Sequence, residues 1–470
     1  MNKNLNIDHI RRIVQKELRK IDQNNYRSGS ILRIEVDCEE VDIEGWISAQ
    51  DFDEKLIWSD RKRNLHIGAI GSVDKLYTTA SAQFTQVYRQ IEKKLSQASE
   101  NVRYLGGFAF DVLSPVQDKW VDFGNYYFII PRFELVRDHD RFFFAGNFLL
   151  NESTESKLLS DLNDIDGRVD RLQEEMPFLV SREQIPGKIM WERIIRQALE
   201  NIQYGEYEKI VLARETHLQF AKDLNPFQIL ARLKTSNPES IHFCIQPQRG
   251  SAFLGGTPEL LYMRDESCIY SEAIAGTRRR GIDKMDDSIL EVELLNSQKD
   301  RNEHWFVIQK IREILNDFCD KVENGTDVTV LKLASVQHLL THIHGILKTG
   351  VHDGQILSGL HPTPAVGGYP TEEALKSLND LEPFRRGWYA APVGWIGRNS
   401  AQFVVAIRSG LMHENNFFLY SGAGIVTGSD PHLEWEEIDT KIANFLRALD
   451  INGHIKARYR ALTSAEQNYL

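Results

Sequence analysis

The chain has 470 residues, with 56 Lys and Arg against 67 Asp and Glu, which leaves a formal net charge of -11. A general nucleic-acid binder needs basic surface to displace phosphate counterions, so this balance argues against that class. The four cysteines form no CxxC pair and give no sign of a disulfide framework or a zinc knuckle. No run approaches the roughly 20 apolar residues of a membrane span, and the first residues lack the apolar core of a secretory signal, so we expect a cytoplasmic protein.

The first part of the chain is predicted to be rich in strands. A helix is expected within 1–25, followed by strands in which apolar and polar residues alternate, at 31–36, 64–71, 125–136 and 141–150. A polar stretch from 151 to 187 ends in Pro186-Gly187 and predicts a connection. The expected division is an N-terminal strand-rich region over 1–187, a second region over 188–455 and a C-terminal tail over 456–470.

The second region mixes helices with runs of strands. The longest helical pattern covers 287–318, and a last helix should begin after Asp430-Pro431, where a capping residue precedes a proline in the first turn. Because the strands come in runs rather than in strict alternation with helices, the order predicts an α+β fold with largely antiparallel sheets. Further strands are expected at 208–214, 241–246, 252–254, 268–274, 332–346, 389–396, 402–408 and 416–420, and a further helix at 188–203.

A glycine-rich turn near the C-terminus precedes an acidic helix. Gly422 and Gly424 let the backbone approach a ligand closely and can expose amide donors to an anion. On the helix that follows, Glu434, Glu437 and Lys441 are spaced i, i+3 and i+7, so their side chains leave the helix on nearly one face. The same spacing also fits a solvated acidic face, and the residues alone leave both interpretations open.

A second acidic position, Glu303, lies in the segment KDRNEH within the long helical pattern. Magnesium binds a few carboxylate oxygens and keeps several waters, so two glutamates from separate helices would suffice to hold it. By itself Glu303 also fits an ordinary surface position. The spacing therefore permits a magnesium site without requiring one.

Two residues could carry acid-base chemistry. Lys209 belongs to a predicted strand in which Lys209, Val211 and Ala213 share one face, and a lysine beside small apolar residues can point into a pocket and act as a general base. Glu259 ends a Gly-Gly-Thr-Pro turn at a sheet edge, where a carboxyl kept protonated by its surroundings could act as an acid. A solvated lysine at a strand end and an ordinary turn are the alternatives.

Other catalytic signatures have little support. His338, His342 and His344 fall on one face of a predicted strand, but no Cys or acidic neighbour completes a zinc site, so we assign no transition metal. The chain has no GxxxxGK[ST], no GxGxxG after a strand and no GxSxG. Nucleotide, dinucleotide and serine-hydrolase functions are therefore not indicated.

Six ordered motifs resemble those of the chorismate-utilising enzymes, which include isochorismate synthase, salicylate synthase, anthranilate synthase component one and aminodeoxychorismate synthase component one. The match runs from about Lys209 to Lys441, and IWSD (57–60) and GGFAFD (106–111) resemble the longer, menaquinone-type isochorismate synthases. The motifs are EAIAGTRRRG (272–281), KDRNEH (299–304), LHPTPAVGGYP (360–370), EPFRRGWYAAPVGW (382–395), FVVAIRSG (403–410) and SGAGIVTGSDPHLEWEEIDTK (421–441).

The resemblance implies a four-layer α/β/β/α sandwich with two large, mainly antiparallel sheets, and it implies roles for individual residues. Glu303 and Glu437 would ligate Mg²⁺, with Glu434 beside them, and the metal would hold the ring carboxylate of chorismate. Lys209 would activate water, and Glu259 would protonate the departing hydroxyl. The implied substrate-binding residues are Ala365, Tyr389, Arg408, Gly422, Gly424, Lys441, His338, Gly276 and Thr277.

Within the family, the resemblance favours isochorismate synthase, an isomerase. Relatives that use ammonia usually carry glutamine in place of Lys209, those that form a lysine adduct carry lysine in place of Ala275, and those that eliminate pyruvate or install nitrogen commonly carry threonine in place of Ala365. The alternatives are salicylate synthase, anthranilate synthase component one and a chorismate-binding subunit without its own catalysis. We expect Mg²⁺ as cofactor, no glutaminase, nucleic-acid or membrane partner, a monomer or homodimer, and a product for menaquinone or siderophore synthesis.

Overall fold

Twenty strands form one continuous hydrogen-bonded sheet in the part of the chain that the structure describes, and the pairings between them are antiparallel. The structure is a computed structural model, which describes residues 3–20, 29–61, 63–150, 160–172, 175–324, 327–334 and 336–451. The predicted tail over 456–470 lies outside these ranges.

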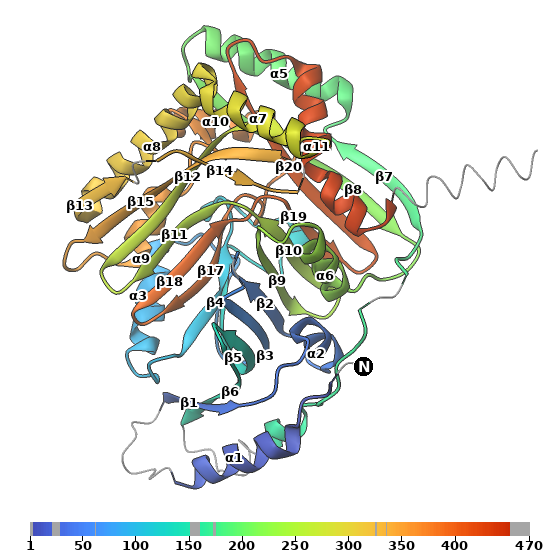
Figure 1. Cartoon of the computed structure of the whole chain (residues 1–470), viewed down its shortest axis with the longest axis vertical. Helices are drawn as coiled ribbons and strands as arrows, with labels where there is room; N and C mark the ends of the chain where they lie inside the picture. The colour runs from blue at the N-terminus through green and yellow to red at the C-terminus, as the bar shows by residue number, and fades with distance from the viewer. Residues whose placement is uncertain are drawn as a thin grey trace, which may run out of the picture.

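The elements follow one another along the chain as shown in Figure 1. The strands are β1 (Ser30–Asp37), β2 (Lys55–Ser59), β3 (Leu65–Thr78), β4 (Arg103–Phe108), β5 (Tyr126–Asp138), β6 (Arg141–Leu150), β7 (Leu179–Ile185), β8 (Lys209–Phe220), β9 (Ile241–Gln248), β10 (Ser251–Thr257), β11 (Leu260–Asp265), β12 (Cys268–Arg279), β13 (Cys319–Asn324), β14 (Thr329–Lys332), β15 (Val336–Leu347), β16 (Gly368–Tyr369), β17 (Pro392–Gly397), β18 (Ser400–Val405), β19 (Ser409–His413) and β20 (Asn416–Val426). The helices are α1 (Ile7–Arg19), α2 (Ile43–Ala49), α3 (Phe84–Leu95), α5 (Lys188–Gln203), α6 (Pro226–Ser236), α7 (Lys284–Asn296), α8 (Gln298–Phe318), α9 (Asp353–Leu360), α10 (Thr371–Leu381) and α11 (Pro431–Ala448).

The order of the strands divides the sheet into two halves that meet at β5. One half runs from β7 through β8, β20, β19, β10, β9, β2 and β3 to β5. The other runs from β5 through β4, β17, β18, β11 and β12 to β15. The largest hydrophobic core joins both halves, since the ring of Phe253 on β10 lies 6.2 Å from the ring of Trp388, which precedes β17.

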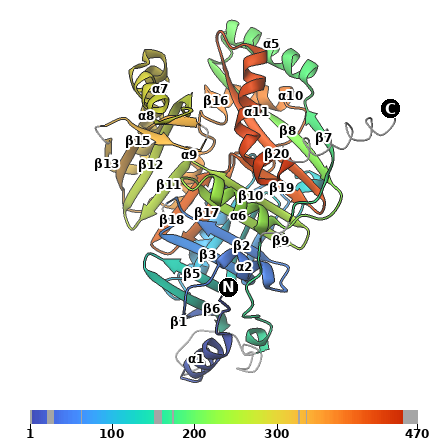
Figure 2. The ribbon, with the colours of Figure 1, turned by 45° about the vertical axis from the view of Figure 1, so that its right-hand side comes forward.

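Helices cover the outer faces of both halves. α5, α10 and α11 pack on β8 and β20, α6 packs on β9 and β10, and α7 and α8 pack on β12 and β15 (Figures 1 and 2). The side of a helix that faces a sheet is apolar, as Trp191, Ile195 and Ala198 of α5 illustrate, because apolar residues recur there at helical spacing. This confirms the predicted α+β class and the α/β/β/α layers. No helix in the described ranges is both long enough and apolar enough to cross a membrane.

The predicted long helix at 287–318 is wrong in one respect. The chain forms two helices there, α7 and α8, and Ser297 separates them. The Ser297 side chain accepts a hydrogen bond from the backbone N–H of Asp300, so this residue caps the second helix and interrupts the first. The break falls within the polar run 296–304, in which no glycine or proline marks an interruption, so the sequence pattern does not reveal it.

Two of the predicted strands are wrong in part: the strand predicted at 402–408 ends at Val405, since Arg408 has a φ of 50°, and the strand predicted at 332–346 is divided between β14 and β15, which pair with each other. The other predicted strands that carry candidate residues are present, and several are longer than expected. β8 continues to Phe220, β12 to Arg279 and β20 to Val426. The strand predicted at 389–396 begins only at Pro392, because Ala390 has a φ of 63° and cannot continue an extended strand. β7 pairs with β8 and β2 pairs with β9, so hydrogen bonds cross residue 187; the division into regions at that residue stays a prediction.

Candidate active site

Lys209 is the first residue of β8 and lies beside the glycine-rich end of β20. A Cβ placed on Gly424 would lie only 3.1 Å from Cε of Lys209, so the glycine leaves the space that the lysine side chain occupies. The Lys209 ammonium lies 3.7 Å from the Glu303 carboxylate of α8, and the two side chains are 22% and 46% exposed. The structure thus brings together two residues that the sequence analysis assigned to different roles.

The amides of Gly422 and Gly424 face away from β8. In an antiparallel pair, alternate residues exchange both ladder hydrogen bonds with their partners, and the others point their N–H and C=O groups outward. Gly422 pairs with Ala213 and Gly424 with Val211, but the Ala213 N–H is donated to Glu382 and the Val211 N–H to a loop carbonyl. The N–H and C=O groups of both glycines therefore point away from β8. Since the pairing of β20 with β19 ends at Tyr420, their amides are available to an anion.

Lys441 and the glutamates of α11 complete one side of the site. The Lys441 ammonium donates to the Gly422 carbonyl at 2.8 Å and lies 2.7 Å from the Glu437 carboxylate. Burial raises the pKa of Glu434, and the Glu437 carboxylate adds to this increase, whereas the Ser429 hydroxyl and the nearby ammonium groups oppose it. The predicted common face of Glu434, Glu437 and Lys441 is consistent with these contacts.

Lys299 of α8 interacts electrostatically with α11. Its ammonium lies close enough to Glu434 of α11 to lower the pKa of that carboxyl. Lys299 and Glu303 are four residues apart on α8 and therefore lie on the same side of the helix. An ion pair joins Glu303 to Lys209 on β8, a hydrogen bond joins Lys441 on α11 to β20, and an electrostatic interaction connects Glu434 of α11 with Lys299 of α8.

Two contacts, one of them buried, hold α8 in place. Arg278 of β12 donates to the Asp300 carboxylate at 2.7 Å, and the ring of His304 contacts the Thr341 hydroxyl of β15 at 2.9 Å. Burial lowers the pKa of His304 to about 4, so its ring is neutral near neutral pH. Because Asp300 and His304 flank Glu303, these contacts fix the position from which the Glu303 side chain extends into the site.

Glu259 follows β10, and its carboxyl lies within the electrostatic reach of Lys209 and Arg408. Burial raises the pKa of this carboxyl to about 7, although the Thr363 hydroxyl and the two cations act in the opposite direction. The Thr363 hydroxyl lies 3.5 Å from Oε1 of Glu259. The carboxyl can therefore be protonated near neutral pH, as a general acid requires.

Ala365 lies in the loop that carries Thr363 and lines the same small pocket as Glu259. The Thr363 carbonyl accepts hydrogen bonds from the N–H groups of Val366 and Gly367, which fold the loop into a tight turn around Ala365. The methyl group of Ala365 is therefore held near the carboxyl of Glu259, where a larger side chain would reduce the space available to a substrate.

Arg408 is held by His338, which fixes the direction of its guanidinium. Nη2 of Arg408 lies 3.2 Å from Nε2 of His338, and Nδ1 of His338 lies 3.1 Å from both the Gly276 carbonyl and the Thr277 hydroxyl. An arginine can only donate and a carbonyl can only accept, so Nε2 accepts and Nδ1 carries the hydrogen. Burial lowers the pKa of His338 to about 3, in agreement with a neutral ring.

The Arg408 guanidinium has no carboxylate within ion-pair distance among the described residues, and burial lowers its pKa to about 10. An arginine with this pKa remains charged near neutral pH. A partly buried cation without an acidic partner is suited to an anionic ligand.

Tyr389 closes the site between Gly422 and the core. Its hydroxyl would lie 3.2 Å from a Cβ placed on Gly422, so the glycine allows the phenol to approach the strand. The ring stacks on Tyr420 with centroids 5.4 Å apart, which fixes its orientation. Burial raises the pKa of Tyr389, so the hydroxyl stays protonated and can donate a hydrogen bond.

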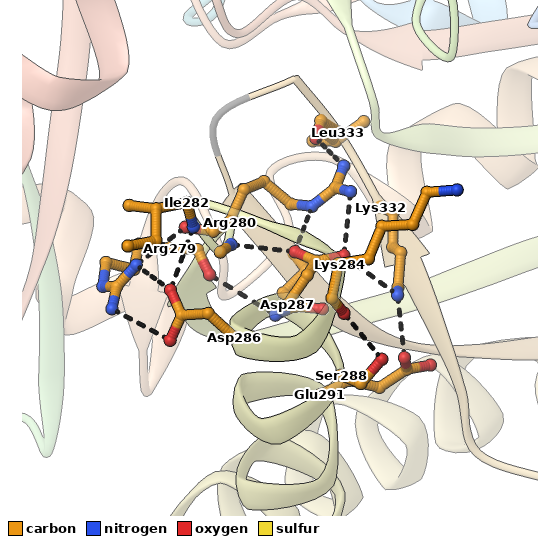
Figure 3. A network of polar contacts seen from close by, with 12 residues as sticks. Arg279, Arg280, Ile282, Lys284, Asp286, Asp287, Ser288, Glu291, Lys332 and Leu333 are labelled. Atoms are coloured by element: carbon orange, nitrogen blue, oxygen red, sulfur yellow. Dashed lines mark hydrogen bonds and ion pairs between the residues drawn. The ribbon is translucent and has the colours of Figure 1, made fainter.

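Figure 3 shows the network that anchors the end of β12 to α7. Arg279 pairs with Asp286 at 2.8 Å, Arg280 pairs with Asp287 at 2.7 Å, and Lys332 of β14 reaches Asp287 at 3.1 Å. The two arginines come shortly after Gly276 and Thr277 in the chain. They therefore hold the backbone on which the His338 contacts depend.

A buried ion pair behind the site connects three of its segments. The side chains of Glu382 and Arg386 are each 2% exposed and lie 2.6 Å apart. Arg386 donates to the Val366 carbonyl at 2.7 Å and to the Val211 carbonyl at 2.6 Å, while Glu382 accepts from the Ala213 N–H. The pair therefore joins the Ala365 loop to the strand that begins at Lys209, and Arg386 lies three residues before Tyr389.

The carboxylates of α8 and α11 have the donor chemistry of a magnesium site. Within the described ranges, no three Asp, Glu, His or Cys side chains lie close enough together to form a ready metal cluster. Magnesium nevertheless needs few protein oxygens because it keeps several waters. Glu303, Glu434 and Glu437 supply only oxygen, and Glu434 and Glu437 repel each other, which a bound cation would relieve. These residues therefore fit Mg²⁺.

The sequence analysis did not single out several residues on which the site depends. Thr363 and Arg386 stand inside the quoted motifs, and the i, i+4 spacing of Glu382 and Arg386 was an available signal. No local signal links Arg278 to Asp300, since the pair forms only when β12 and α8 pack together.

Comparison with known proteins gives a family match over most of the chain. A family model described as "Chorismate binding enzyme" matches residues 16–450 of the chain. The chain is 33% identical over 405 residues to the chloroplastic isochorismate synthase of Catharanthus roseus, covering 84% of this chain and 70% of that protein. It is 32% identical over 414 residues to isochorismate synthase MenF of Bacillus subtilis, covering 84% and 88% respectively.

Solved structures are similar over most of the chain. MenF, the menaquinone-specific isochorismate synthase from Escherichia coli, superposes with a TM-score of 0.82 at 27% identity and covers 93% of this chain and 98% of its own. Anthranilate synthase component I from Streptococcus pneumoniae superposes with a TM-score of 0.68 at 18% identity, covering 81% and 92%, which supports the fold alone.

Proposed function

Because the chain belongs to the family of chorismate-binding enzymes, we propose that it is an isochorismate synthase, an isomerase that converts chorismate to isochorismate. One observation carries the proposal. The Glu259 carboxyl, whose pKa is raised to about 7, lies within the electrostatic reach of both Lys209 and Arg408. A base and a protonated acid beside an anion-binding group are what the exchange of one ring hydroxyl for another requires.

Chorismate is a dianion, and the site offers positive charge and donors to each carboxylate. We assign the enolpyruvyl carboxylate to Arg408, Tyr389 and the outward amides of Gly422 and Gly424. Lys441 would lie beside the ring. His338, with Gly276 and Thr277, acts by orienting Arg408, and Ala365 borders the ring near Glu259. A negatively charged protein can thus hold an anionic substrate because its cations are gathered at one place.

Glu303 and Glu437, with Glu434 beside them, are the proposed ligands of Mg²⁺. When bound there, the metal would supply positive charge for the ring carboxylate of the substrate. Two of these carboxylates pair with Lys209 and Lys441 in the structure, and such partly exposed pairs are weak enough to exchange.

In the proposed reaction, Lys209 in its neutral amine form takes a proton from a water molecule as the oxygen of that water forms a bond to ring carbon two. The ring double bonds shift, the bond between carbon four and its hydroxyl breaks, and Glu259 gives a proton so that the hydroxyl leaves as water. Lys209 gains one proton and Glu259 loses one, so atoms and charge balance. One carbon–oxygen bond replaces another, and the reaction should therefore be reversible.

The test is incubation of the purified chain with chorismate and Mg²⁺, followed by chromatography of the products. The proposal requires isochorismate, in equilibrium with chorismate, whether or not ammonium is added. Salicylate with pyruvate would instead identify a salicylate synthase, and anthranilate that forms only with ammonium would identify an anthranilate synthase. Binding of chorismate without any turnover would indicate a substrate-binding subunit.

A further inference from the structure

Arg61, in the turn between β2 and β3, reaches the proposed acid from the N-terminal part of the chain. β2 pairs with β9 and β9 with β10, and the same residue of β9 stands opposite Ser59 of β2 and Gly256 of β10. Both pairings are antiparallel, so β2 and β10 run in the same direction and end at the same edge of the sheet. Arg61 and Pro258 each lie two residues beyond this row. The register therefore brings the Arg61 side chain to the peptide group that precedes Glu259.

The Arg61 guanidinium donates to a carboxylate and to a backbone carbonyl. Nη2 lies 2.6 Å from the Pro258 carbonyl oxygen and 2.8 Å from Oε2 of Glu272, and Nη1 lies 2.9 Å from Oε1 of Glu272. The side chains of Arg61 and Glu272 are 17% and 7% exposed, so solvent screens the pair only in part. A forked contact of this kind fixes the direction of the arginine as well as the position of its charge.

The backbone around Glu259 is held at three places. Its N–H donates to the Thr257 hydroxyl oxygen at 3.2 Å, and its carbonyl accepts from the Val405 N–H at 3.1 Å. The Pro258 carbonyl, which shares a peptide plane with the Glu259 N–H, accepts from Arg61. Loss of the arginine would release one side of this plane, and the direction in which the Glu259 side chain leaves the backbone would change with it.

Glu272 places a negative charge near the proposed acid. Glu272 and Glu259 line the same small pocket. Burial raises the pKa of Glu259 to about 7, and the charge of Glu272 acts in the same direction. The Thr363 hydroxyl and the cations of Lys209 and Arg408 act in the opposite direction. The guanidinium that pairs with Glu272 compensates this negative charge and so limits its effect on the acid.

Further titratable side chains lie around the two carboxyls. Tyr389 interacts electrostatically with Glu259, and burial raises the pKa of the phenol, so its hydroxyl stays protonated. Lys310 of α8 lines the pocket and pairs with a glutamate of its own helix. Nδ1 of His342 lies 3.6 Å from Oε1 of Glu272, and this side chain is 52% exposed. An imidazole can change its charge near neutral pH, so a test by pH has to account for it.

We propose that Arg61 is a positioning residue for the acid Glu259, because it holds the peptide group before that residue and neutralises the neighbouring Glu272. This rests on the proposed function, in which Glu259 gives the proton. The turn after β2 thereby gives the N-terminal part of the chain a direct part in the active site.

The test is the pH profile of kcat/KM for chorismate in two single variants. Arg61→Met leaves Glu272 without compensation, so Glu259 should hold its proton more tightly and the descending limb should move to higher pH. Glu272→Gln removes a negative charge, so the limb should move to lower pH. An ion pair with a purely structural role would have the same consequence whichever partner is lost. Limbs that move in the same direction, or that do not move, overturn the proposal.

The height of the profile reports the peptide group. In Arg61→Met, kcat on the acid side of the limb should fall by as much as about 10²-fold, the loss that a misplacement of about 1 Å can cause, and KM should change little. Adding Glu272→Gln to this variant should return the limb toward its wild-type position while kcat stays low, because the Pro258 carbonyl still lacks its donor. An unchanged kcat in folded Arg61→Met overturns the positioning role.

The conservative variant Arg61→Lys separates charge from geometry. It keeps the positive charge but loses the fork, so it should lower kcat without moving the limb. If Arg61→Met does not fold, Arg61→Lys and Glu272→Gln decide, and the absence of either expected effect overturns the proposal.

Arg63→Met is the matched control. Arg63 lies in the same turn, but it donates to the Lys234 carbonyl of α6 rather than to a group of the site. Its replacement should leave both the rate and the profile unchanged. Each profile is also repeated with His342→Gln, where the same shifts are expected because they belong to Glu259 and not to the imidazole.

Melting temperatures distinguish a failure of this proposal from a failure of the proposed function. If the wild type forms no isochorismate, the proposed reaction is wrong, but the charge of Glu259 can still be followed. The difference in melting temperature between Glu259→Gln and its parent should change as the pH rises through about 7 in the wild type, at higher pH in Arg61→Met and at lower pH in Glu272→Gln. The same pH dependence in all three parents overturns the coupling of Arg61 to Glu259.

Discussion

The Lys209 ammonium lies 3.7 Å from the Glu303 carboxylate, so the proposed base and a proposed metal ligand share one edge of the site. Lys209 begins a strand of one half of the sheet, whereas Glu303 lies on a helix that covers the other half. Both side chains are partly exposed, which keeps the pair weak. Their contact follows only from the packing of the two halves, and the first predictions concern these two residues.

Replacement of the proposed base should remove turnover and leave the fold intact. Lys209→Ala is expected to lower kcat/KM for chorismate by about 10²- to 10⁴-fold, the usual contribution of a general base. The melting temperature should change little, because Lys209 is partly exposed and makes only a weak ion pair. Lys376→Ala, at an exposed lysine of α10 that pairs with Glu372, is the control and should keep full activity. Normal turnover in Lys209→Ala would refute the role of the lysine.

The pH dependence of turnover should report the carboxyl of Glu259. Burial raises its pKa to about 7, and only the protonated form can act as the acid. We therefore expect kcat/KM to fall as the pH rises through about 7. Glu259→Gln has no proton to donate and should be nearly inactive. A pH profile of kcat/KM tests this, and a profile without a descending limb in the neutral range would contradict it.

The carboxyl of Glu259 should also make the stability of the protein depend on pH. This effect can be measured whether or not the protein is active. A carboxyl with a raised folded pKa contributes stability that is complete below its ordinary value of 4.5 and is lost as the pH rises through about 7. The melting temperature of Glu259→Gln, relative to that of the wild type, should therefore increase over this range. If the difference in melting temperature between the two proteins does not change with pH, Glu259 is not buried as described.

Removal of magnesium should stop turnover, and the proposed ligands should set the metal affinity. Chelation with EDTA is expected to abolish activity, and added Mg²⁺ to restore it. Glu303→Gln and Glu437→Gln should each raise the Mg²⁺ concentration needed for half-maximal activity by at least about tenfold. Replacement of a residue that only supports a metal ligand already lowers the metal affinity by about that factor. Direct titration with Mg²⁺ gives the affinity independently.

Glu436→Gln provides a control on the same helix. Glu436 is exposed and lies near His432 rather than in the site. Its replacement should leave the magnesium dependence unchanged. An equal loss of magnesium affinity in Glu436→Gln and Glu437→Gln would mean that the charge of α11, rather than a specific ligand, attracts the metal.

The buried pair Glu382–Arg386 should be important for stability. Glu382→Gln leaves the Arg386 guanidinium buried without its counter-charge, so the free energy of unfolding should fall by about 3–5 kcal/mol in a urea titration. Glu382→Gln combined with Arg386→Met should cost less than the sum of the two single changes. The exposed pair of Lys376 and Glu372 is the comparison, and its loss should cost less than about 1 kcal/mol. Equal costs for both pairs would contradict the burial of the first.

The sequence by itself determined the elements and the candidate residues. Alternation of apolar and polar residues fixed the strands, and Asp430-Pro431 fixed the start of α11, because these signals act over a few neighbouring residues. A strand face marked Lys209, a turn marked Glu259, and the motifs marked the acidic helices. The break at Ser297 was missed, because it falls in the polar run 296–304, in which no glycine or proline marks an interruption.

Only the tertiary structure decided which of these residues meet. The contact of Lys209 with Glu303, the hold of His338 on Arg408 and the raised pKa of Glu259 all arise between segments far apart in the chain. Distances between such segments and the burial of a carboxyl depend on how two half-sheets and their helices pack. No local pattern of residues encodes these quantities, because they are properties of the assembled core.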